Sequence, residues 1–245
     1  MSLSHTEAMD LQATELQRAL TLLESLTATD WSAPTDCPAW DVRRMYLLVL
    51  GACEGGASAR EQGHQMRAAR TRQRAGGGPL EAALSAVQVD ERERLSSDEL
   101  LRRLREVAPR TVRSRRRLPA LLRKGVRMKV DGPVAERWAL GYLVDTIYLR
   151  DLWMHRVDAC RAVGREVELT AAHDGRIVAD VVEEWGRRHG EPYHLRLGGA
   201  AGGEFRGNGA AADAPVGHDL DAVDFCRILA GRATGEGQLA TIVPF

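Results

Sequence analysis

The sequence predicts a bundle of four helices over residues 1–164, followed by a smaller α+β domain over residues 165–245. In the first part, apolar residues recur at helical spacing through several long segments. After Gly164 the composition changes to short apolar segments bounded by glycine, which is typical of strands and turns. Helices with such connections pack as a bundle.

Periodicity and end signals predict the four helices of the bundle. Residues 5–27 carry leucine and methionine at helical spacing, and a proline-containing loop follows. Asp41 can cap a second helix, "DVRRMYLLVLGACEGGASAREQ". The glycines of "RAGGGPL" form a break before a third helix, "ELLRRLREVAPRTVRS". The fourth helix is expected over about 134–163, and Gly164 ends it.

The second part is expected to hold two helices and three short strands. "TAAHDGRIVADVVEEWGRRHG" predicts an amphipathic helix, and "YHLRLGG" and "GEFRGNG" predict strands. "DLDAVDFCRILAGR" predicts another helix, and "LATIVPF" a closing strand. The glycine cluster "GGAAGGEFRGNG" lacks the Gly-Lys-Ser/Thr ending of a phosphate-binding loop, so a turn between strands is favoured.

Composition argues against several classes of protein. The formal net charge is zero, so no whole-molecule field points to nucleic acid or to a membrane. Arg, Asp and His interrupt the longest apolar run before about 20 residues, so no membrane span or membrane partner is expected. The first residues lack the pattern of a secretory signal, and the four cysteines are far apart. These features favour free thiols and a cytoplasmic location.

The stretch "RDLWMHRVD" places Asp151, His155 and Asp158 on one face of the apolar fourth helix. Burying ionisable groups is costly unless they are paired or bind a metal. An acid and a histidine four residues apart can present two ligands to a divalent metal such as zinc. Asp158 could be a third ligand, or an acceptor that orients the imidazole. A buried ion-pair network with Arg150 or Arg156 is the alternative.

Residues 102–129 hold a dense run of arginines, opposed within the run by Glu106. Such a run can contact nucleic acid or an anionic ligand, or it can form a solvated helix face. No aromatic residue is interleaved for base stacking, whereas leucine and valine recur. The sequence therefore favours a solvated face, leaves an anion site open and does not favour nucleic acid as a partner.

Three segments together resemble the mycothiol-dependent maleylpyruvate isomerase family of the DinB-like superfamily. "TDCPAWDVRRMYLLVLG" looks like the family's loop into the second bundle helix, and "LRDLWMHRVDACRAVGR" looks like its metal-ligand helix. "DAVDFCRILAGRATGEGQLATIVPF" looks like its C-terminal sterol-carrier-protein-like domain. The resemblance covers nearly the whole chain and implies a DinB-like four-helix bundle.

The resemblance also implies a divalent metal, usually zinc, and mycothiol as cosubstrate in the cleft between the two domains. The family's acid and histidine of the fourth helix match at Asp151 and His155. Its glycine-arginine pair matches at Gly231 and Arg232, which makes Arg232 a candidate catalytic contact to substrate or thiol. The family's third ligand is a histidine eight residues after the tryptophan of the CPxW stretch, and Leu48 occupies that position here. The metal is therefore expected to bind weakly or not at all.

Two functions follow from these observations. The first is a mycothiol-dependent isomerase or S-transferase that acts on a small electrophile through a metal-bound thiolate, with Arg232 holding a substrate carboxylate. The second is a metal-free, non-catalytic relative that binds a small molecule or a protein partner in the interdomain cleft. The substrate and the oligomeric state do not follow from the sequence.

Overall fold

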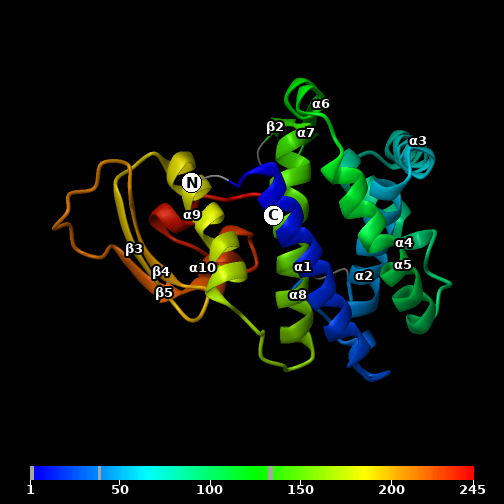
Figure 1. The fold of residues 1–245 in the computed structure, drawn as a ribbon, viewed down its shortest axis with the longest axis horizontal. Coiled ribbons are helices and arrows are strands. Elements are labelled where there is room, and N and C mark those ends of the chain that lie inside the picture. The colour runs from blue at the N-terminus through cyan, green and yellow to red at the C-terminus, as the bar shows by residue number, and fades with distance from the viewer. Residues whose placement is uncertain (1–2, 38–39, 132–134) are drawn as a thin grey trace. The chain divides into compact units, whose positions relative to one another are not determined.

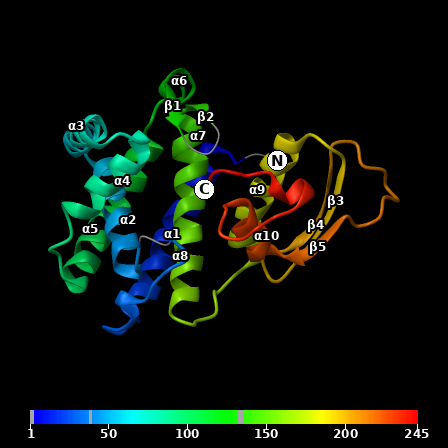
Figure 2. The same cartoon turned by 180° about the vertical axis from the view of Figure 1, so that it is seen from behind.

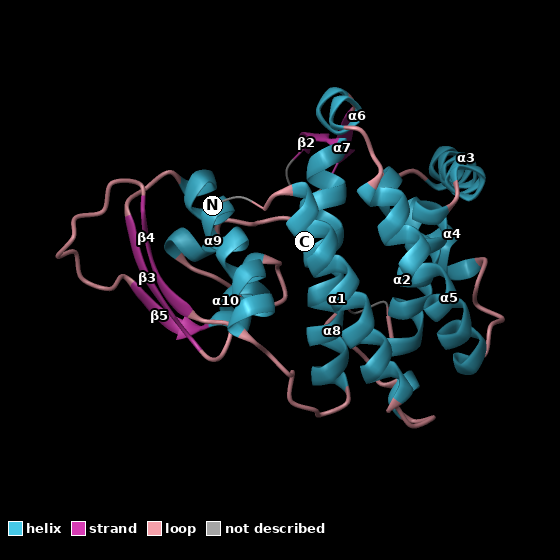
Figure 3. Ribbon diagram, in the orientation of Figure 1, coloured by secondary structure: helices cyan, strands magenta, loops and turns pink. Residues whose placement is uncertain are grey.

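The computed structural model describes residues 3–37, 40–131 and 135–245, and its backbone divides into two compact units (Figure 1). One unit is Ser4–Arg165, and the other comprises Glu166–Phe245 with Leu3. The first is helical apart from one hairpin, and the second combines helices with a small sheet (Figure 3). The predicted fold class is confirmed. No helix in the described part of the chain is long and apolar enough to cross a membrane.

Helices α1, α2, α5 and α8 form the bundle of the first unit (Figure 2). They span His5–Glu24, Val42–Ala57, Ser97–Arg116 and Tyr148–Ala162. A capping box starts α1, since the Ser4 hydroxyl accepts from Glu7 N–H and the Glu7 carboxylate accepts from Ser4 N–H. Asp41 caps α2 as expected, accepting from the Arg44 backbone N–H at 2.7 Å.

The predicted second helix is wrong beyond Ala57, because the chain turns at Ser58. Ser58 is extended, and its side chain caps a separate helix, α3 (Ala59–Gly76), by accepting from Glu61 N–H. A further helix that the sequence analysis did not assign, α4 (Leu80–Asp90), packs against α2 and α3. The glycine break therefore separates α3 from α4.

The fourth helix begins later than predicted. Strands β1 (Arg127–Asp131) and β2 (Ala135–Ala139) pair in an antiparallel hairpin, with Met128 opposite Trp138. Helix α6 (Ala120–Gly125) precedes this hairpin, and the fourth helix starts with α7 (Leu140–Tyr142). Residues 133 and 134, where the prediction began, lie outside the described residues. Cross-strand pairing, which helical periodicity does not reveal, replaces the first turns of the expected helix.

The second unit contains a sheet of three strands in the order β4-β3-β5. The expected strands are β3 (Tyr193–Gly198) and β4 (Gly203–Gly207), which are antiparallel, with Leu195 opposite Phe205. Strand β5 (His218–Asp221) runs parallel to β3 and was not predicted. The predicted closing strand is wrong, because 241–245 forms no strand and a short 3₁₀ helix at Gly237–Ala240 precedes it.

Two helices complete the core of the second unit. Helix α9 (Arg176–His189) follows a π-helical turn at Ala171–Gly175, and α10 (Ala222–Leu229) follows β5. The buried Trp185 ring meets the Phe225 ring edge-on at 5.3 Å. The glycine cluster contains turns, as expected, and Asn208 and Gly209 both have positive φ, which this dipeptide tolerates.

Candidate functional site around Asp151 and His155

The candidate site lies on α8, whose two ends are both defined by specific backbone geometry. At its start, Leu143–Ile147 forms a π-helical turn between α7 and α8. At its end, Gly164 has a φ of 66°, its N–H bonds to the Arg161 carbonyl, and the Arg165 N–H bonds to the Cys160 carbonyl. This is a Schellman motif, which the sequence signal at Gly164 predicted correctly.

The structure brings Asp151 and His155 together on α8. The His155 Nε2 atom lies 3.3 Å from the Asp151 Oδ1 atom, and the exposed fractions of the two side chains are 5% and 35%. Although this distance fits an ion pair, neither ring nitrogen makes a hydrogen bond within the described residues. A buried polar group without a hydrogen bond lowers the stability of the fold. The imidazole is therefore available to bind a ligand.

Asp158 is fully buried on the same helix and has a different contact. The Cys37 thiol donates to the Asp158 Oδ2 atom at 3.9 Å. Nearby, the Thr35 hydroxyl accepts from the Cys37 N–H at 3.1 Å and donates to the Trp40 carbonyl at 2.8 Å. Asp158 therefore contacts the loop before α2, and its role as a metal ligand stays a prediction.

The donor set can be compared with the needs of a zinc ion. A catalytic zinc site has three protein ligands. Asp151 and His155 supply two, and no third His, Cys, Asp or Glu among the described residues groups with them within 4.8 Å. Leu48 lies partly buried on α2, which contacts α8. Asp151 and His155 therefore do not form a three-ligand zinc site with any other described residue.

Helix α8 carries a second buried pair, which joins it to α1. The Arg156 guanidinium donates to both Glu15 carboxylate oxygens, at 2.5 and 3.2 Å, and both side chains are almost fully buried. The sequence offered Arg156 as a partner for the acids of its own helix, and the structure adds Glu15 on α1 as a partner. A signal existed, because Glu15 lies four residues after Leu11 and four before Ala19 on the buried face of α1.

Tyr46 on α2 lies beside this pair. Its ring is 1% exposed, and its hydroxyl makes no hydrogen bond with the described residues. Burial raises the pKa of the Tyr46 phenol far above its usual range, and the Glu15 charge adds to this effect. The phenol is therefore neutral at all ordinary pH values and cannot act as a base.

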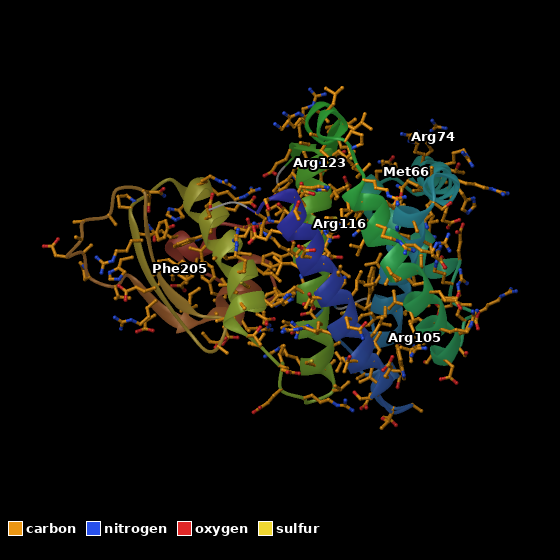
Figure 4. All side chains as sticks on the ribbon, in the orientation of Figure 1. Met66, Arg74, Arg105, Arg116, Arg123 and Phe205 are labelled. Atoms are coloured by element: carbon orange, nitrogen blue, oxygen red, sulfur yellow. The ribbon has the colours of Figure 1, made fainter. Side chains whose placement is uncertain are left out.

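The arginine run pairs mainly with acids from other helices or along its own helix. Arg103 bonds to Glu54 on α2, and Arg105 bonds to Glu24 on α1 at 2.7 Å. Arg116 bonds to Asp10 at 2.6 Å, and Figure 4 labels both Arg105, near the middle of α5, and Arg116, at its end. These ion pairs support the solvated helix face that the sequence favoured.

Arg232 belongs to the second unit. It follows Gly231, which has a φ of 75°, and its N–H bonds to the Arg227 carbonyl at 2.9 Å in a second Schellman motif. Its guanidinium donates to the Ala230 carbonyl at 3.4 Å. The glycine-arginine pair is therefore explained locally by the end of α10, and the catalytic role of Arg232 stays a prediction.

Comparisons with known proteins agree on the fold. A family model described as the mycothiol maleylpyruvate isomerase N-terminal domain matches residues 13–160. A crystal structure of a mycothiol-dependent maleylpyruvate isomerase is 13% identical, with a TM-score of 0.57, and a histidine-to-alanine mutant structure is 14% identical, with a TM-score of 0.56. Each alignment covers 95% of this chain and 91% of the other. Comparison with curated proteins finds no significant match.

Proposed function

Because the chain belongs to the mycothiol maleylpyruvate isomerase family, we propose that it is a mycothiol-dependent isomerase or S-transferase acting on a small electrophile. The family assignment agrees with the resemblance found in the sequence. The observation that carries the proposal is the buried His155 imidazole, which lies beside the partly buried Asp151 carboxylate and makes no hydrogen bond with the part of the chain that the structure describes. Such a pair can take up and return a proton during thiol chemistry.

The chemistry requires a thiolate, since a thiol is the weaker nucleophile. Asp151 is the exposed member of the pair, so the thiol approaches from its side and its proton passes to the carboxylate–imidazole pair. The thiolate sulfur adds to an electrophilic carbon. In an isomerisation, elimination of the same sulfur re-forms the double bond after rotation; in a transfer, a leaving group departs and takes a proton from the pair.

A metal does not enter this scheme, because the described donor set lacks a third ligand. In the family pattern the metal would stabilise the thiolate; here the pair on α8 is proposed to hold the thiol proton. Arg232 is proposed to bind a substrate carboxylate, since a guanidinium can bond to both carboxylate oxygens.

The test is thiol-dependent turnover by the purified protein, measured with mycothiol and an unsaturated keto-diacid such as maleylpyruvate. We expect turnover by the wild type and a loss of about a hundredfold or more in His155→Gln. His64→Gln is the matched control, because His64 is an exposed histidine of the same unit that pairs with Glu91. Absence of mycothiol-dependent turnover across a panel of electrophiles would refute the proposal.

Leu48 favours a second candidate, a non-catalytic relative that binds a small molecule or a protein partner. Leucine at the family's histidine position leaves the ligand set incomplete. A relative that no longer catalyses a reaction can lose a metal ligand in this way. Calorimetric titration with mycothiol separates the candidates. Binding without turnover supports the second function, whereas binding with turnover supports the first.

A further inference from the structure

The exposed apolar side chains of the first unit gather on α6 and the residue after it. Leu121 is 82% exposed, Leu122 46% and Val126 41%. Among the described residues, the one other large apolar side chain that is exposed is Ile242, at 39%, in the second unit. A cluster of exposed apolar residues in a protein that otherwise buries them marks an interaction surface.

The scaffold holds these side chains outward. Arg123, between Leu122 and Lys124, points inward and donates to Asp145 at 3.0 Å and to the Leu118 carbonyl at 3.3 Å (Figure 4). The Leu140 N–H bonds to the Val126 carbonyl at 2.9 Å, which fixes the end of α6 to the start of α7. Figures 1 and 2 both show α6 at one end of the bundle. We call Leu121, Leu122, Lys124, Val126 and Arg127 the α6 tip.

The charge around the α6 tip is positive although the whole chain is neutral. Both lysines of the chain, Lys124 and Lys129, lie in or next to it. Lys129 pairs with Asp131 at 2.7 Å, whereas Lys124 and Arg127 form no ion pair with the described residues. Apolar side chains flanked by unpaired cations complement a surface that is both apolar and anionic.

Two other occupants fit less well. A second copy of the chain, related by a twofold axis through the tip, would place the cations against their own copies, which is repulsive. A protein partner needs roughly 800 Å² on each side and a complementary face. The tip offers three apolar side chains, and a leucine exposed by 82% cannot line a groove.

We propose that the α6 tip docks the protein onto the surface of an anionic lipid bilayer, with Leu121 and Leu122 inserted among the acyl chains and Lys124 and Arg127 at the headgroups. A bilayer requires no matching face, so a small projecting wedge is sufficient. This peripheral contact differs from a membrane span, and it goes beyond the sequence-based expectation of no membrane partner. It is independent of the proposed function.

The test is co-sedimentation of the full chain with vesicles of phosphatidylcholine, alone or mixed equally with phosphatidylglycerol. We expect binding to the anionic vesicles, reduced about tenfold in Leu121→Ser/Leu122→Ser. Lys124→Ser/Arg127→Ser should lose the preference for anionic lipid, and added salt should weaken wild-type binding. Ile242→Ser is the matched control and should bind like the wild type. Circular dichroism melting confirms that each variant is folded.

Three results would overturn the proposal. The first is failure of the wild type to bind anionic vesicles. The second is binding that the leucine double variant retains in full. The third is a dimer, seen by light scattering, that the leucine double variant abolishes, since this would assign the α6 tip to a second copy of the chain.

Discussion

Helix α8 carries two acid–base pairs that differ in their geometry. Arg156 reaches across to Glu15 on α1, and its guanidinium bonds to both carboxylate oxygens in a fully buried setting. His155 has Asp151 on its own helix at 3.3 Å, and its ring nitrogens make no hydrogen bond within the described residues. The first pair satisfies its donors and acceptors within the protein, and the second does not. This difference separates a structural pair from a candidate functional one.

The comparison predicts its largest effect at Glu15. In Glu15→Gln, the buried Arg156 guanidinium loses its counter-charge, and the free energy of unfolding should fall by about 3–5 kcal/mol. Urea unfolding followed by circular dichroism measures this change. Glu24→Gln, which breaks the exposed pair with Arg105, is the control and should cost less than about 1 kcal/mol. Equal losses in the two variants would remove the distinction between buried and exposed pairs.

The second prediction concerns the pair on α8, where substitutions should lower activity rather than stability. His155→Gln and Asp151→Asn should lower thiol-dependent turnover by about a hundredfold or more, because the proton acceptor is lost. Their free energies of unfolding should change by less than about 1 kcal/mol, since neither His155 ring nitrogen makes a hydrogen bond with the described residues. Steady-state kinetics and urea unfolding on the same preparations check both parts. A loss of stability as large as that of Glu15→Gln would make the α8 pair structural.

The third prediction concerns Leu48. If this side chain occupies the missing ligand position, Leu48→His should raise zinc affinity by roughly a hundredfold, because a third protein ligand completes the site. Competition with a chromogenic chelator measures the affinity. The double variant Leu48→His/His155→Gln is the control and should lose the gain. Tight stoichiometric zinc in the wild type would contradict the idea that the site is incomplete.

The smallest expected effect is at Tyr46, beside the buried pair. Its hydroxyl is buried without a hydrogen bond among the described residues, so Tyr46→Phe should leave the protein as stable as the wild type or about 1 kcal/mol more stable. Thermal and urea unfolding measure whether the free energy of unfolding rises or falls. A loss above about 1 kcal/mol would mean that the hydroxyl has a partner, such as a buried water.

Local signals in the sequence predicted the ends of elements well. Asp41 and Gly164 act at short range through their own backbone neighbours, so the sequence around them is sufficient. The β1–β2 hairpin was missed, because its register depends on pairing between strands rather than on helical periodicity. Strand β5 was missed for a similar reason, since it pairs in parallel with a distant strand.

The geometry of the candidate residues was predicted in part, and their role as a site stays a prediction. Spacing alone placed Asp151 and His155 on one face, because four residues make about one helical turn. The partner of Arg156 could not be named, because Glu15 lies 141 residues earlier in the chain. The arginine run is similar, since Arg103, Arg105 and Arg116 find their acids on α1 and α2. Pairings between helices depend on packing, which the sequence does not show directly.

The π-helical turn Leu143–Ile147 is a local bulge in the fourth helix that bonds to several other elements. It accommodates one residue more than an α-helical turn would, and Asp145 within it bonds both His5 and Arg123. Gln12 from α1 also bonds the Val144 carbonyl there at 2.6 Å. Deleting one residue would return the turn to α-helical geometry, and it would move Asp145 and the Val144 carbonyl away from His5 and Gln12. In related chains, a deletion here should therefore be accompanied by loss of the residues corresponding to His5 and Gln12, which makes this turn a place to look for correlated change.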